Sequence, residues 1–222
     1  MSRKLHLITI ACVLSNLAML NAADAPQNAT AFWKTSSGTA SDEDIVIADL
    51  VSGNDLVMTP GTGAKIVDDN AAPDHKALVF DGTQIGTMRA KKKVDLRDGF
   101  YATMQIKPED EGADSQSIMY FFTVAELRLS RESKNLVFVV WIAPQKTYEV
   151  RVPAKMGDWN NVSISVQGRT AEITVDGTTT PIALPPDVNL NLVESSLSVG
   201  NATERPYSGA IANISLATSK PN

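Results

Sequence analysis

The sequence predicts an all-β protein built as a two-sheet antiparallel sandwich. Apolar and polar residues alternate at period two through much of the chain, which is typical of half-buried strands. Gly, Pro, Asn and Asp punctuate the gaps between these segments. No stretch keeps a helical period over three turns. Many short strands at near-regular spacing, without helices, favour two packed antiparallel sheets.

The strands are predicted in order along the chain. In 125–131, Leu127 and Leu129 point to one face, whereas Glu126 and Arg128 point to the other. Segment 135–142 is apolar on both faces, which predicts a central strand. The predicted strands are 76–84, 100–107, 125–131, 135–142, 147–152, 161–167, 170–177, 195–200 and 209–217.

The stretch DWNNVSISVQGRTAEITVDG, residues 158–177, predicts a hairpin. Trp159 begins a strand after a turn at Gly157-Asp158. The strands 161–167 and 170–176 are joined through Gly168-Arg169. Asp176-Gly177 then makes the next tight turn, because glycine adopts a positive φ cheaply.

Three landmarks in this order resemble the laminin-G-like, concanavalin A-like jelly-roll superfamily. They are the strand KALVFDGTQ (76–84), the Trp159 hairpin ending in VDG, and the final strand within 197–217. The resemblance covers roughly residues 30–218. It implies a concanavalin A-like sandwich, a fold that often binds carbohydrate.

The chain departs from that family at positions that bear on calcium. Asn160-Asn161 stands where the family has His-His, and Ala212-Asn213 stands where the last strand has Asp-Glu. Several members hold a structural calcium near such positions, and calcium needs six to eight oxygen ligands. We expect no cofactor, because the missing aspartate argues against calcium. Three acids of one polar loop remain as candidate ligands, the alternative being a solvated acidic loop: Asp68, Asp69 and Asp74.

The N-terminus predicts export. Arg3 and Lys4 precede a mostly apolar run, and small residues follow at 20–25, as in a secretory signal peptide. The run is too short for a membrane anchor, so we expect no transmembrane segment after cleavage. The expected organisation is a signal peptide at 1–23, a polar leader with room for a first strand at 24–43, one laminin-G-like domain at 44–218, and a tail at 219–222.

The net charge and the cysteine content bear on the protein's partners and its location. The formal net charge of −5 argues against nucleic acid as a partner. The only cysteine, Cys12, lies in the predicted signal, so the mature chain has neither disulfide nor thiol. Lipidation of Cys12 is a minor alternative. We expect a secreted or periplasmic protein.

The sequence gives little support for catalysis. Glucanases of this fold carry an E-x-D-x-x-E strand, which is absent here, and the four acids of 108–114 follow a proline in a predicted turn. The alginate-lyase branch needs a Q-x-H strand, also absent. The two histidines are His6, in the signal, and His75, in a loop. We expect a protein that is not an enzyme, with a degenerate hydrolase or lyase as the remaining catalytic hypothesis.

A glycan site needs an aromatic platform with polar hydrogen-bonding groups beside it. The predicted strands could bring such groups to one sheet face, although large aromatics of a jelly roll also serve its core. The predicted ligand-binding residues are Tyr120, Glu126, Arg128, Trp141 and Tyr148.

The basic run 89–93 gives a further hypothesis. It could meet an acidic polysaccharide or a membrane surface. The alternative is an edge strand or loop protected from aggregation by its lysines.

The function expected from the sequence is therefore an exported, non-catalytic recognition module that binds a polysaccharide or glycoconjugate through one sheet face. The alternative is a structural or protein-interaction domain of the cell envelope, with no sugar site.

Overall fold

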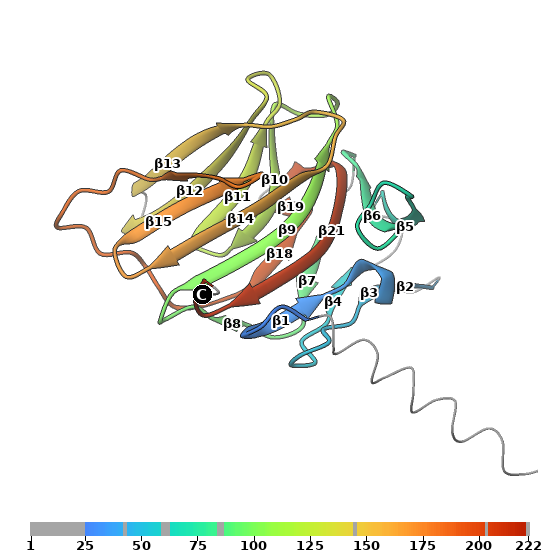
Figure 1. The fold of residues 1–222 in the computed structure, drawn as a ribbon, viewed down its shortest axis with the longest axis horizontal. Coiled ribbons are helices and arrows are strands. Elements are labelled where there is room, and N and C mark those ends of the chain that lie inside the picture. Colours follow the sequence, from blue (N-terminus) through green and yellow to red (C-terminus); the bar gives the residue numbers. More distant parts are fainter. Residues whose placement is uncertain are drawn as a thin grey trace, which may run out of the picture.

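The computed structural model describes residues 25–41, 44–58, 63–83, 87–143, 146–202 and 204–220. These residues form two antiparallel sheets stacked as layers (Figure 1), here named sheet A and sheet B. The only helix among them is a single 3₁₀ turn, η1 (Thr35–Ser37). The predicted all-β antiparallel sandwich is confirmed.

Sheet A is built around the last strand of the domain, β21, which pairs with β9, β6 and β1. Its order is β16-β15-β14-β9-β21-β6-β5, with β1 also on β21. The strands are β1 (Ala29–Trp33), β5 (Ala64–Asp68), β6 (Lys76–Asp81), β9 (Phe100–Pro108), β14 (Asn160–Gln167), β15 (Thr170–Val175), β16 (Thr178–Pro181) and β21 (Ser208–Ala217).

Sheet B has the order β13-β12-β11-β10-β18-β7-β4-β3-β2. Its strands are β2 (Thr39–Ala40), β3 (Ile45–Ile47), β4 (Leu56–Met58), β7 (Met88–Ala90), β10 (Ser115–Phe121), β11 (Ala125–Ser130), β12 (Asn135–Ala143), β13 (Lys146–Pro153) and β18 (Leu197–Val199). Two short ladders lie outside both sheets: β8 (Val94–Asp95) with β17 (Glu194–Ser195), and β19 (Asn201–Ala202) with β20 (Arg205–Pro206).

The predicted hairpin is present as β14 and β15. Val162 faces Val175 and Gln167 faces Thr170, so the turn lies at Gly168-Arg169 as predicted. Asp176 and Gly177 have φ angles of 47° and 83° and lead directly into β16. This left-handed pair is the geometry that a two-residue hairpin turn demands, and it explains the Asp-Gly sequence there.

The core fills the space between the sheets with the inward residues of each strand. Phe100 of sheet A meets Phe121 of sheet B with ring centroids 4.8 Å apart. Trp33, Phe138 and Tyr207 are fully buried in the same cluster. Burying such large side chains supplies the main stabilisation that locks the two layers together.

The structure describes some of the segments expected from the sequence and leaves others outside the described residues. The predicted signal, 1–23, and Cys12 lie outside the described residues. Within the expected leader, β1 pairs with β21 and β2 pairs with β3, so this segment is built into the sandwich. No helix of the described ranges is long and apolar enough to cross a bilayer.

Asp49 ties β1 to the loop that precedes β4. Its carboxylate accepts hydrogen bonds from the backbone N–H groups of Phe32 (2.9 Å), Val51 (3.0 Å) and Asn54 (3.0 Å), and a short one from the Ser52 hydroxyl. Burial alone would raise the pKa of Asp49, but the Ser52 and backbone hydrogen bonds outweigh it and hold the pKa below its usual value. Asp49 is thus a charged anchor for the start of the fold.

We expect Asp49→Asn to lower the free energy of unfolding at neutral pH by about 1–3 kcal/mol, because an amide cannot satisfy all these donors. A carboxylate with a lowered pKa stabilises the fold above its unfolded pKa of about 4 and loses that effect as pH falls. The variant should therefore lose less further stability in acid than the wild type. Urea unfolding at about pH 7 and about pH 3 measures both effects.

The exposed Asp187→Asn is the matched control and should leave both values nearly unchanged. Equal acid sensitivity in Asp49→Asn and the wild type would show that Asp49 does not act as a charged anchor.

Candidate functional site

Strand register places one row of side chains across the outer face of sheet B. Residues paired across strands share a face, so a single row can be followed from β4 to β13. It contains both hydrophobic and charged groups, with an aromatic residue near the middle. The row is Val57, Arg89, Ser198, Tyr120, Glu126, Val139 and Glu149.

Four of the five predicted site residues lie on this outer face. Tyr120 and Glu126 belong to the row itself. Arg128 and Trp141 lie two residues along their strands from row members, so they share its face. Tyr148 is one residue from Glu149, and its half-buried side chain packs against the core instead. The structure therefore brings together all of the predicted residues except Tyr148.

Three aromatic rings meet on the outer face. The Tyr120 ring contacts Trp141 edge-on, with centroids 5.8 Å apart, and contacts Phe122 edge-on at 6.0 Å. Phe122 is 58% exposed, and the other two are half-buried. The sequence prediction omitted Phe122 as a site residue, although its spacing of two from Tyr120 places it on the same face. An exposed aromatic cluster of this kind offers flat apolar surface with polar edges.

A hollow of about 430 Å³ opens beside the rings, between β7, β18 and β10. Its volume falls in the range of small-molecule sites. Hydroxyl, amide and guanidinium groups line it together with two of the rings. The lining residues are Thr87, Arg89, Ala90, Tyr120, Phe122, Ser196, Leu197, Ser198 and Asn201.

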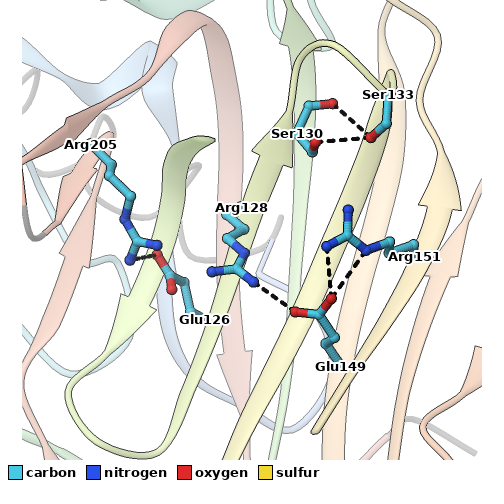
Figure 2. Close-up of polar contacts among 7 residues, drawn as sticks. All are labelled: Glu126, Arg128, Ser130, Ser133, Glu149, Arg151 and Arg205. Carbon is cyan, nitrogen blue, oxygen red and sulfur yellow. Dashed lines mark hydrogen bonds and ion pairs between the residues drawn. The ribbon is translucent and has the colours of Figure 1, made fainter. Parts of the chain in front are cut away.

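Charged side chains of alternating sign follow the same face beyond the rings (Figure 2). Arg205 donates to Glu126 at 2.7 Å, and Arg128 donates to Glu149 at 2.7 Å. Arg151 donates to the other Glu149 oxygen through Nη2 at 2.8 Å and Nε at 3.1 Å. We call these five residues the ion ladder.

The ion ladder covers apolar surface. Val137 and Val139 of β12 face outward, yet both are almost completely buried. Their cross-strand neighbours are ladder members: Arg128 and Arg151 beside Val137, and Glu126 and Glu149 beside Val139. Long charged side chains lay their aliphatic stems over such surface while their charged ends stay in water. The predicted central strand, 135–142, is therefore apolar on both faces although it lies next to the edge strand β13.

Glu126 is the most buried member of the ion ladder. Its side chain is 1% exposed, and Arg205 reaches its Oε1 from the β19–β20 hairpin. Its Oε2 is buried without a hydrogen-bond partner among the described residues. A buried carboxylate depends strongly on its one cation, so this pair fastens the hairpin to sheet B.

The outer face of sheet A differs in chemistry. A row of hydroxyl side chains crosses it from β21 to β16, and two neighbouring pairs of its members are hydrogen-bonded. The Thr103 and Ser215 hydroxyls are 2.6 Å apart, and those of Thr174 and Thr179 are 2.8 Å apart. The row is Ser215, Thr103, Ser163, Thr174 and Thr179. Aromatic rings with a hollow beside them distinguish the outer face of sheet B from this one.

The candidate calcium ligands are engaged by the protein itself. Asp74 pairs with Lys34 at 3.5 Å and accepts a hydrogen bond from Asn213, whereas Asp69 caps the turn at Ala71. Asp68 lies 4.0 Å from Lys76. Within the described ranges, no three His, Cys, Asp or Glu side chains are grouped so as to hold a metal ion. The three acids therefore do not form an assembled calcium site in these segments.

The basic run 89–93 starts in an interior strand rather than at an edge. β7 lies between β18 and β4, and it places Arg89 on the outer face of sheet B. Lys91 leaves the sheet and pairs with Asp55 at 2.9 Å. Lys92 and Lys93 are exposed in the turn that follows. Of the four basic residues of the run, only Arg89 lines the hollow.

Comparison with known proteins shows the fold. No protein-family model matches the sequence, and no curated protein matches it. Among solved structures, domain 4 of AbnA, a GH43 extracellular arabinanase from Geobacillus stearothermophilus in complex with arabinotriose, aligns with a TM-score of 0.63 and 14% identity. The alignment covers 85% of this chain and 91% of that domain.

Two other similar structures are longer than this chain. The Trypanosoma rangeli sialidase aligns with a TM-score of 0.62 and 14% identity over 89% of this chain, which spans 31% of the sialidase. The binding domain of Paraclostridial Mosquitocidal Protein 1 aligns with a TM-score of 0.62 and 15% identity, over 88% of this chain and 50% of that one. At these identities the likeness establishes a β-sandwich of the lectin-like kind.

We expect Arg205→Met to lower the free energy of unfolding by about 3 kcal/mol, because it leaves the buried Glu126 carboxylate without its cation. The double variant Glu126→Leu/Arg205→Met should recover most of that loss, since an apolar pair fills the same space. Arg151→Met is the matched control and should cost less than about 1 kcal/mol, because its ion pair is exposed. Denaturant unfolding of the wild type and the three variants measures these differences in stability. A single variant no less stable than the double one would contradict the fastening role.

Proposed function

We propose that this chain is an exported, non-catalytic recognition module that binds polysaccharide or glycoconjugate on the outer face of sheet B. The observation that carries the proposal is the cluster of Tyr120, Phe122 and Trp141 beside the hollow. Sugar rings present apolar C–H faces and hydroxyl edges. Aromatic rings next to hydroxyl, amide and guanidinium groups match both parts of that surface.

The fold and its relatives support the same class of ligand. The arabinanase domain that resembles this chain was solved in complex with arabinotriose. We infer membership of the laminin-G-like, concanavalin A-like superfamily from the order of the sequence landmarks. The basic, apolar N-terminal pattern supports a secreted or periplasmic location.

The arrangement of carboxylates on this face supports binding rather than hydrolysis. Glycoside hydrolysis needs two carboxyl groups roughly 5 to 9.5 Å apart, with room for substrate between them. Glu126 and Glu149 lie on β11 and β13, with β12 between them. Each carboxylate also forms ion pairs within the protein: Glu126 pairs with Arg205, and Glu149 pairs with Arg128 and Arg151. Both act as structural acceptors within the ion ladder.

We expect the purified protein to bind at least one member of a panel of neutral and acidic oligosaccharides, arabinotriose among them, with calcium and with chelator. Phe122→Ala, Tyr120→Ala and Trp141→Ala should each weaken that binding by about tenfold or more, as truncation of a central aromatic contact does. Isothermal titration calorimetry measures the affinities, and thermal unfolding checks that each variant is folded.

Tyr101→Ala provides the matched control, because Tyr101 is a half-buried tyrosine on the outer face of sheet A. Equal losses in Tyr101→Ala and Phe122→Ala would remove the site from sheet B. A folded protein that binds nothing in the panel would favour the structural or protein-interaction role in the envelope.

A further inference from the structure

The hollow holds one cation, Arg89, and its other described lining residues are uncharged. Arg89 lines it, and its cross-strand partners on this face are Val57 and Ser198. Arg89 is exposed, and no carboxylate of the described residues lies within ion-pair distance of it. Its guanidinium is therefore available to a ligand that enters the hollow.

Other cations near this face are occupied. Arg128 and Arg151 share Glu149, Arg205 holds Glu126, and Lys91 holds Asp55. Each of these pairs neutralises its cation inside the protein. Arg89 thus differs from its neighbours by its place beside the rings and by the absence of a carboxylate partner in the described segments.

The negative charge of the whole chain contrasts with the local positive charge of Arg89. A formal net charge of −5 repels anions at long range, so an anionic ligand needs a local positive group to be held. A guanidinium presents paired N–H donors in a planar fork that matches a carboxylate through two parallel hydrogen bonds. One such fork beside two rings suits a single carboxylate carried on a sugar ring.

We propose that the hollow binds a hexuronic acid unit of an acidic polysaccharide, with Arg89 holding the sugar carboxylate. The inference rests on the proposed function and adds the class of ligand to it. The Tyr120 and Phe122 rings pack against the sugar ring, and the hydroxyls of Thr87 and Ser198 face its hydroxyl groups. Arg89 is thereby the residue that selects an acidic sugar over a neutral one.

The test uses tetragalacturonate and its fully methyl-esterified form, which has the same sugar rings without the carboxylate charge. The wild type should bind the acid at least about tenfold more tightly than the ester, because a charge-assisted hydrogen bond is lost in the ester. Arg89→Gln should remove this preference by weakening acid binding about tenfold while leaving ester binding unchanged. Calorimetry at fixed ionic strength measures all four affinities.

Lys92→Gln is the matched control. It removes the same charge a few residues away, and its exposed side chain lies outside the hollow, whereas its backbone contact with Asn54 does not depend on the side chain. It should leave the preference for the acid intact. Dextran sulfate, which carries charge without carboxylate, should bind more weakly than tetragalacturonate and should not depend on Arg89.

The outcomes separate the two proposals. Equal affinity for acid and ester, with Phe122→Ala still weakening both, would overturn the uronate inference and leave glycan recognition standing. If Arg89→Gln and Lys92→Gln weakened tetragalacturonate binding equally, the attraction would be diffuse and not a specific contact with Arg89. That result would also overturn the inference. Binding of neither ligand, together with no binding across the whole panel, would remove both proposals.

Discussion

The register of sheet B is the constraint on which the rest of the molecule depends. Successive side chains of a strand point to opposite faces, so burial of Leu127, Leu129 and Phe138 in the core fixes what the other face displays. A slip of one residue would exchange the two faces completely. The same hydrophobic contacts that stabilise the sandwich therefore align Arg89, Tyr120 and Glu126 in one row outside it.

Two parts of that outer face differ in chemistry. At the β12–β13 side, the ion ladder covers Val137 and Val139 and fastens the β19–β20 hairpin through Glu126 and Arg205. Near the middle of the sheet, charged pairs give way to aromatic rings and a hollow whose cation has no carboxylate beside it. The paired charges stabilise the face, whereas the rings and Arg89 form the proposed binding surface.

The fold could be predicted from the sequence because its signals are local. Alternation at period two marks the strands, and Asp176-Gly177 marks a turn whose positive φ angles few other residues adopt easily. The same alternation predicted most of the candidate site. It places Tyr120, Glu126, Arg128 and Trp141 at outward positions of their strands. Tyr148 does not join them, because it alternates with Glu149 and Arg151 and so packs against the core.

The remaining parts of the site come from contacts between distant segments. Arg205 reaches Glu126 across 79 residues of sequence, and the place of Arg89 depends on the pairing of β7 with β18. No local pattern specifies either contact. Phe122 had a usable signal in its spacing from Tyr120, but its exposure is set by the way β10 ends at Phe121.

Mapping the bound ligand by NMR tests the location of the site most directly. Backbone and side-chain resonances would be followed while tetragalacturonate and a neutral oligosaccharide from the panel are titrated into the protein. We expect shift changes concentrated at Tyr120, Phe122, Trp141 and Ser198, with Arg89 responding to the acid. Changes confined to the hydroxyl row of sheet A, with the outer face of sheet B unaffected, would contradict recognition on this face.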